Sequence, residues 1–165
     1  MKKRTKYILG GLLLILLIGW VIMQLLTLIH PIYDNPPVVR EPTWDSPETR
    51  ALVEQACFDC HSNETVWPWY SYIFPMSDLL RQDVEKGREV LNFSEWEISR
   101  GDQANIEAMV ESISKDQMPL PYYLILHPEA QLTDEQKGQL ITGLIATASE
   151  GDDRLEADEL DKDEE

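Results

Sequence analysis

The longest apolar run of the chain lies close to its N-terminus. Residues 7–29, YILGGLLLILLIGWVIMQLLTLI, contain no charged side chain, and about 20 such residues cross the hydrocarbon core of a bilayer as a helix. Residues 1–6 carry four basic side chains, and basic flanks stay in the cytoplasm. The pattern predicts a single membrane-spanning helix with the rest of the chain on the far side.

A cleaved signal peptide is the alternative interpretation of residues 7–29. Its apolar core usually has about 7–15 residues and ends at a small-x-small site. The sequence LTLIHPIYD at the end of this run offers no such site. An uncleaved anchor is therefore the favoured prediction.

Amphipathic segments of helical period follow farther along the chain. Ser46 can cap a helix and Pro47 can take its first position, and this helix would run into the stretch ACFDCHS. Apolar side chains on one face predict further helices over 77–90 and 103–114. In the first of these, Gly87 lowers the helix propensity.

The last predicted helix begins at Thr133, whose hydroxyl can form a capping box with Gln136. Its apolar stripe consists of Leu140, Ile141, Leu144 and Ile145. No alternation of apolar and polar residues is long enough to predict a strand. The fold class predicted by these patterns is all-α.

Composition divides the chain into five parts. A basic leader (1–6) and the anchor (7–29) are followed by a proline-rich spacer (30–45), where proline blocks regular structure. The helical domain covers 46–149, and the acidic segment 150–165 has too few apolar residues to order itself, which predicts a disordered tail.

The charge is distributed unevenly between these parts. All thirty acidic residues follow the anchor, so this portion has a net charge near −20. Such a charge repels nucleic acid and anionic membrane surfaces. Protein partners remain compatible with it.

The stretch ACFDCHS holds both cysteines of the chain, Cys57 and Cys60, followed directly by His61. A c-type haem is attached through two thiols separated by a turn-sized interval, and the next histidine falls under the ring to bind iron. Location beyond a membrane anchor suits this attachment. The motif therefore predicts one covalent haem c.

Three other chemistries use cysteines at this spacing. A disulfide between residues three apart closes a very short loop and stabilises little. A redox dithiol expects a β-α-β context, which the helical pattern lacks. A zinc site needs four ligands, and only two further histidines, His30 and His127, are present.

The sixth position of the iron is predicted to be filled by Met118. This residue lies in QMPLPYY, a loop stiffened by two prolines, where no helical packing explains a methionine. His127 and Met76 are the substitutes, and an open position is the further alternative. Met109 lies on the apolar stripe of its helix, which favours a core role.

Around this motif the sequence resembles a known family. The stretches CFDCHSNETVWPWYSYIFPMSDLLRQDVEKGREVLNFSEW and QMPLPYYLILHPEAQLTDEQ are similar to those of the bacterial haem-binding domain family of small anchored or exported proteins. The order of helices and the MP loop also resembles class I c-type cytochromes. The resemblance covers about residues 51–144 and implies a cytochrome c-like fold.

The resemblance implies haem linked to Cys57 and Cys60, iron bound by His61, and Met118 in the distal position. Aromatic residues of the shared pattern are expected to pack around the cofactor: Trp67, Trp69, Tyr70, Trp96, Tyr122 and Tyr123. Three arginines are candidates for pairing with the haem propionates: Arg50, Arg81 and Arg88.

The function predicted from these features is electron transfer. The chain would be a monohaem c-type cytochrome, tethered to the bacterial inner membrane by one helix, that passes single electrons between periplasmic redox partners. It would be a carrier and not an enzyme. A haem-based sensor or gas-binding domain is the alternative, while a two-haem peroxidase would need a second attachment motif.

Overall fold

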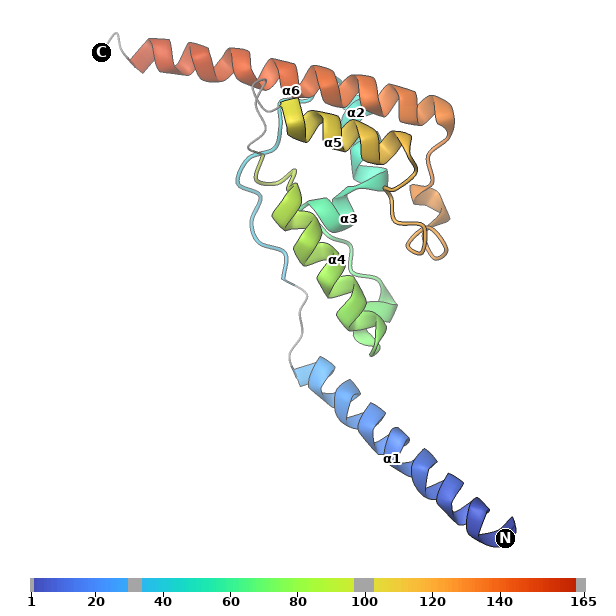
Figure 1. The fold of residues 1–165 in the computed structure, drawn as a ribbon. Helices are drawn as coiled ribbons and strands as arrows, with labels where there is room; N and C mark the ends of the chain where they lie inside the picture. The colour runs from blue at the N-terminus through green and yellow to red at the C-terminus, as the bar shows by residue number, and fades with distance from the viewer. Residues whose placement is uncertain (1, 30–33, 97–102, 163–165) are drawn as a thin grey trace.

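A computed structural model describes residues 2–29, 34–96 and 103–162, with side chains described over 3–29, 34–96 and 105–149. The described backbone is helical, and pairing in extended conformation is confined there to one isolated bridge between Arg40 and Glu95. The predicted all-α class is therefore confirmed. Figure 1 shows the elements: α1 (Lys2–Ile29), α2 (Pro47–Ala56), α3 (Phe58–His61), η1 (Trp69–Tyr72), α4 (Met76–Val90), α5 (Gln103–Ser114), η2 (Pro128–Ala130) and α6 (Asp134–Lys162).

Both predicted helix caps are present. The Ser46 hydroxyl accepts a hydrogen bond of 3.1 Å from the Thr49 amide at the start of α2. At the start of α6, the Gln136 amide donates to the Thr133 hydroxyl at 3.2 Å, while the Thr133 amide donates to the Gln136 side chain at 2.9 Å. These bonds satisfy amides that have no partner within the helix, so the sequence sets where α2 and α6 begin.

The core lies where α6 packs on α2 and α5, a layer that Figure 1 shows at the end of the domain distant from α1. Leu140 and Leu144 of the predicted stripe are fully buried there. Within the core, the rings of Phe93 and Trp96 stack with centroids 5.6 Å apart. The large aromatic rings supply much of the apolar area that a domain of this size must bury.

The segment before α2 does not act only as a spacer. The amides of Val39 and Arg40 both donate to the Ser94 carbonyl, at 2.9 and 3.0 Å, and Trp96 donates back to the Arg40 carbonyl at 2.9 Å. The side chain of Trp44 packs against the core. Residues 34–45 are therefore part of the domain surface, because proline-rich backbone without helix still offers amides and carbonyls for pairing. Residues 30–33 lie outside the described part.

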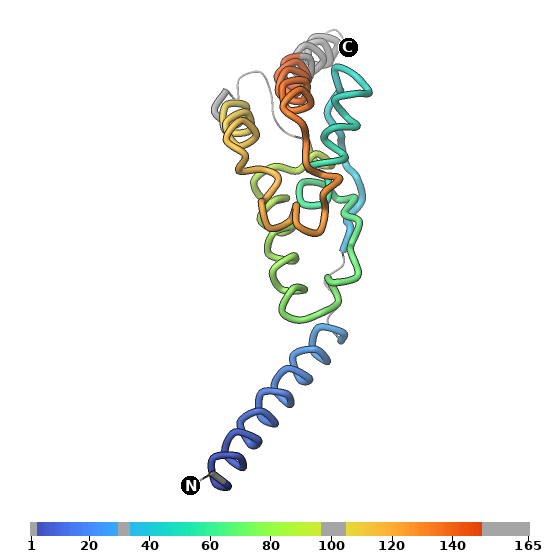
Figure 2. The backbone as a smooth tube through the Cα atoms, turned by 90° about the vertical axis from the view of Figure 1, so that its right-hand side faces the viewer, coloured from blue at the N-terminus to red at the C-terminus, as the bar shows by residue number. Residues whose placement is uncertain are grey.

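Helix α1 has the length and apolar composition of a membrane span, as predicted, and a signal sequence fits the same description. Its second half touches the domain. The indole of Trp20 donates to the Phe74 carbonyl at 3.1 Å, and the Gln24 amide donates to the Tyr72 carbonyl at 2.7 Å. Figure 2 shows α1 meeting the domain at the end formed by η1 and the start of α4.

The acidic C-terminal segment differs from its prediction. Helix α6 continues to Lys162, whereas the sequence predicts a disordered tail from residue 150. The prediction weighed the lack of apolar residues, but extending an existing helix avoids the cost of nucleation. The segment is also rich in good helix formers such as Glu and Leu. Its side chains and residues 163–165 lie outside the described part.

Candidate haem site

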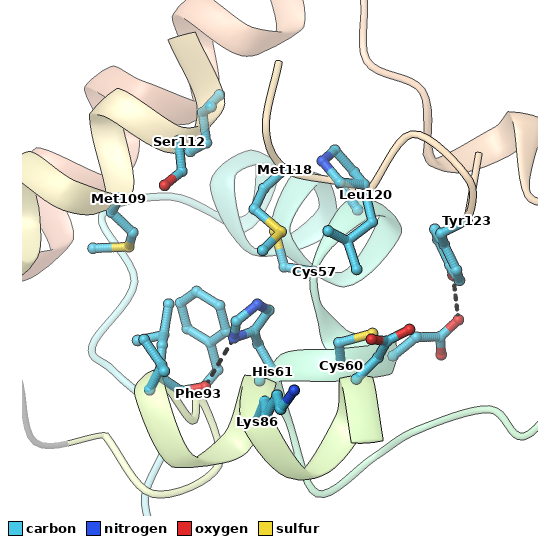
Figure 3. A pocket seen from close by; sticks show the side chains of 18 of the residues that line it. Cys57, Cys60, His61, Lys86, Phe93, Met109, Ser112, Met118, Leu120 and Tyr123 are labelled. Carbon is cyan, nitrogen blue, oxygen red and sulfur yellow. Dashed lines mark hydrogen bonds between the residues drawn. The ribbon is translucent and has the colours of Figure 1, made fainter. Parts of the chain in front are cut away.

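A cavity of about 380 Å³ opens in the middle of the domain. Its wall is formed by the end of α2, by α3, α4 and α5, and by the loop before η2. Cys57, Cys60, His61 and Met118 all line it (Figure 3). Ligand pockets usually measure about 300–1,000 Å³, so this space is large enough for a cofactor.

The two cysteines and His61 reach the cavity through a break between two helices. Cys57 ends α2, where its amide donates to the Val53 carbonyl at 2.8 Å. The single turn α3 follows, closed by a bond of 2.8 Å from the His61 amide to the Cys57 carbonyl. This turn brings both sulfur atoms and the imidazole to the same cavity, as Figure 3 shows.

Gly87 permits the close packing of α4 on α3. A Cβ atom at this position would lie 2.3 Å from the carbonyl oxygen of Cys60 and 2.9 Å from its carbonyl carbon. Backbone atoms cannot move aside as the end of a side chain can. Gly87 has a low helix propensity, but its lack of a side chain allows α4 to pack closely against α3 and to form the floor of the site.

The imidazole of His61 is held by one nitrogen and open at the other. Its Nδ1 atom lies 3.0 Å from the Leu91 carbonyl oxygen, which fixes the ring and makes Nδ1 the donor. The other ring nitrogen faces the cavity in Figure 3. Burial lowers the pKa of His61, so the ring is neutral, and a neutral imidazole with one nitrogen tied to a carbonyl is a typical metal ligand.

Both cysteines are free thiols in the structure. Desolvation raises the pKa of Cys57 to about 12, with a smaller contribution from Cys60. The pKa of Cys60 is also raised to about 12, by desolvation and then by the charges of Asp59 and Asp83. A redox dithiol requires a lowered pKa, because the thiolate is the nucleophile. These thiols have the opposite property.

Met118 enters the cavity from the loop that follows α5, across from α4 and above His61 in Figure 3. The loop is joined to the end of α5, because the amides of Gln117 and Met118 both donate to the Ser112 carbonyl, at 2.9 and 3.2 Å. Met109 also lines the cavity, besides packing against the core. The sequence assigned Met109 to the core alone.

The two substitutes for Met118 lie elsewhere. His127 uses both ring nitrogens: Nε2 lies 2.6 Å from the Tyr70 hydroxyl and Nδ1 lies 2.9 Å from a Glu129 carboxylate oxygen. Met76 begins α4 and has 36% of its surface exposed. Neither residue is part of the cavity wall.

Three charged residues of the cavity wall were not singled out by the sequence: Asp59, Asp83 and Lys86. The Tyr123 hydroxyl donates to Asp59 at 2.6 Å, and the Tyr122 hydroxyl donates to Asp83 at 2.8 Å. Desolvation and the bond to Asp59 raise the pKa of Tyr123, so its proton stays on the hydroxyl. Lys86 is the cation of the wall. The i, i+3 spacing of Asp83 and Lys86 on the helix is the only signal the sequence carried.

The expected partners of the haem propionates are engaged within the protein. Arg50 pairs with Glu41 at 3.0 Å, and Arg81 lies 3.2 Å from Glu85. The guanidinium of Arg88 donates to the Ser62 and Asp34 carbonyls, at 2.8 and 2.9 Å. None of the three arginines lines the cavity.

The expected aromatic shell is only partly present. Tyr122 and Tyr123 line the cavity. Trp96 is buried in the core instead, and Tyr70 is buried beside His127. Trp69 has 73% of its surface exposed and does not reach the cavity. Spacing along the chain could not show which of these aromatic residues line the cavity and which lie in the core or at the surface. Each position depends on how α4 and the loop before η2 are packed.

The site therefore combines a fixed neutral imidazole, two adjacent thiols and a thioether around one cavity of cofactor size, which is a donor set that fits haem. Comparison with known families agrees with this: the haem-binding domain family matches residues 20–146. The chain belongs to the haem-binding domain family and is a haem-binding protein. Searches of curated proteins and of solved structures give no significant match.

Proposed function

We propose that the chain is a membrane-tethered c-type cytochrome with one covalent haem, which passes single electrons between redox partners on the periplasmic side of the bacterial inner membrane. The observation that carries this proposal is the meeting of Cys57, Cys60, His61 and Met118 at one cavity. The first three come from one short segment and Met118 from a loop more than fifty residues later. Iron held there would alternate between its ferrous and ferric states and so carry one electron.

Cys57 and Cys60 would hold the haem covalently. Each S–H bond would add across one vinyl C=C bond of haem, giving a thioether carbon–sulfur bond, with the thiol hydrogen moving to the neighbouring vinyl carbon. No oxidant and no leaving group is needed. The thiols are neutral and face the cavity, so the hydrogen to be transferred is in place.

His61 and Met118 would be the two side chains that hold the haem iron. The Leu91 carbonyl orients His61 and keeps its second nitrogen available. A thioether as the second ligand raises the reduction potential relative to two imidazoles. Two side chains that would both hold the iron suit a carrier of single electrons.

A gas-binding or sensor function is the second candidate, because the Met118 loop is irregular. Met118 has 39% of its surface exposed and belongs to no helix. A ligand on such a loop is easier to displace than one on a packed helix. Slow and incomplete binding of carbon monoxide to the reduced protein is expected for the carrier, and rapid, complete binding for the sensor.

The attachment is tested on the full chain, expressed with haem-attachment machinery and extracted with acidic acetone. The haem is expected to stay on the polypeptide of the wild type and of Ser112→Ala, a control change in the same cavity wall. It is expected to be removable from a variant with both Cys57→Ala and Cys60→Ala. Haem that leaves the wild type on extraction, or that stays on the double variant, would overturn covalent attachment.

A further inference from the structure

The segment from Thr65 to Ser77 is apolar, aromatic and free of charge, in a chain that is otherwise rich in acids. We name it the aromatic loop. It includes η1 and forms the end of the domain next to α1 (Figures 1 and 2). Five of its large side chains are exposed and none of them lines the haem cavity: Val66, Trp69, Tyr72, Ile73 and Met76. Exposed apolar surface of this kind marks an interaction site.

Helix α1 supplies hydrogen bonds to the backbone of the aromatic loop. The Trp20 indole donates to the Phe74 carbonyl at 3.1 Å. Gln24 binds twice, because its amide nitrogen donates to the Tyr72 carbonyl at 2.7 Å and its amide oxygen accepts from the Phe74 amide at 3.1 Å. Backbone groups in lipid must be satisfied within the protein. These three bonds meet that requirement at the tip of the loop.

The same bonds explain a polar residue in the apolar helix. An unpaired glutamine amide in a membrane helix is costly. Gln24 lies in the apolar run, and both ends of its amide are occupied by the aromatic loop. The helix and the loop therefore complement each other in a setting where water is scarce.

The position of Trp20 along α1 gives the depth of the contact. Trp20 follows Lys6 by fourteen residues, which is about 21 Å along a helix. The hydrocarbon core is about 30 Å thick. If Lys6 marks its inner edge, the Trp20 contact lies roughly 9 Å inside the outer edge, within the 5–10 Å to which interfacial segments are buried.

We propose that the aromatic loop is inserted into the outer leaflet of the same membrane that α1 spans, as a second attachment of the haem domain. The inference rests on the proposed membrane anchorage of α1. Tryptophan and tyrosine favour the membrane–water interface because their rings are amphipathic. The acidic surface of the domain opposes electrostatic adsorption, so insertion depends on this uncharged segment.

Insertion at this end fixes the height of the haem site. Helix α4 begins at Met76 in the aromatic loop, and Gly87, at the floor of the cavity, lies eleven residues farther along. That separation is about 17 Å of helix. The cavity is held close above the bilayer in one orientation, which suits a redox partner embedded in the same membrane.

The test uses the full-length haem protein in vesicles of phosphatidylethanolamine and phosphatidylglycerol that carry a diazirine on the acyl chain. After illumination, cross-linked peptides are mapped by mass spectrometry. Lipid is expected on α1 and on the aromatic loop, with several-fold less on the loop 118–126. Ile125 and Leu126 of that loop are also exposed and apolar, so they control for simple apolar reactivity.

Two matched variants sharpen the result. Trp69→Asp is expected to reduce cross-linking of the aromatic loop several-fold, while Ile125→Asp leaves it unchanged, and both should retain the wild-type haem spectrum. If lipid is cross-linked to α1 but the aromatic loop is cross-linked no more than the loop 118–126, the proposed insertion is wrong and the membrane anchorage of α1 still holds. If no lipid is cross-linked to α1, both the membrane anchorage of α1 and the insertion of the aromatic loop are wrong.

Discussion

At the scale of single residues, two helical glycines of this chain have opposite surroundings. Gly87 of α4 faces the carbonyl of Cys60, and an added Cβ would lie 2.3 Å from that oxygen. Gly138 of α6 has no atom within 4 Å of the position where its Cβ would be. The first glycine is needed for contact between two elements, whereas the second only lowers helix propensity.

The change Gly87→Ala is therefore expected to lower the free energy of unfolding by about 1–3 kcal/mol, the usual cost of overpacking, because α4 must move away from the cysteine segment. Haem incorporation should fall with it. Gly138→Ala is the control and should raise the free energy of unfolding by about 0.5–1 kcal/mol. Denaturant unfolding of both variants measures the difference, and equal values would refute the account of Gly87.

For the candidate site, the sequence could predict a shared location only for residues that lie close together in the chain. Cys57, Cys60 and His61 lie next to one another in the chain, so their common cavity was predictable. Met109 was not, because one side chain of a helix faces both core and cavity. The same limit applied to Arg88, whose guanidinium donates to the carbonyl groups of Ser62 and Asp34, which are distant in the chain and are brought near only by folding.

At the scale of elements, Arg50 joins the segment before α2 to the helix itself. Its guanidinium contacts Glu41 at 3.0 and 3.1 Å through two nitrogen atoms, and Glu54 at 2.8 Å. The hydrogen bond from Arg50 lowers the pKa of Glu41 below its usual 4.5. Because the pKa of Glu41 is lower in the folded than in the unfolded protein, its charge stabilises the fold at pH values above the unfolded-state pKa. This stabilisation is lost as the pH falls through the lower, folded-state pKa.

Glu41→Gln is accordingly expected to lower the free energy of unfolding at pH 7 by no more than about 1 kcal/mol, since the pair is partly exposed to solvent. The loss of stability below about pH 5 should be shallower than in the wild type. Unfolding curves at several pH values measure both effects. Glu89→Gln, at an exposed position of α4, is the control, and an unchanged acid profile in Glu41→Gln would contradict the role of the pair.

Elements with local start signals were predictable, and those that depend on distant partners were not. Ser46, Thr133 and Gln136 define helix starts through bonds within a few residues. The packing of residues 34–45 depends on Ser94, which is more than fifty residues away. For residues 150–162, the acidic composition predicts disorder, whereas a helix that has already begun can continue through such residues without a new nucleation step.

At the scale of the whole molecule, the candidate haem site and the aromatic loop lie at different distances from α1 within one domain. Helix α1 and the aromatic loop meet through side chain to backbone bonds, and α4 runs from that contact to the cavity. The apolar run of α1 was evident from the sequence. The contact between α1 and the aromatic loop could not be predicted, because an apolar helix that only anchors a domain and one that also packs against it have the same composition.

The central claim of the account is a haem iron held between His61 and Met118. The near-infrared spectrum of the ferric full-length protein tests it most directly, because iron bound to a thioether sulfur gives a weak band there. The band is expected in the wild type and in Met109→Leu, and it should be lost in Met118→Leu, whose reduced form should bind carbon monoxide rapidly. A wild-type protein that lacks the band and binds carbon monoxide completely would contradict the claim.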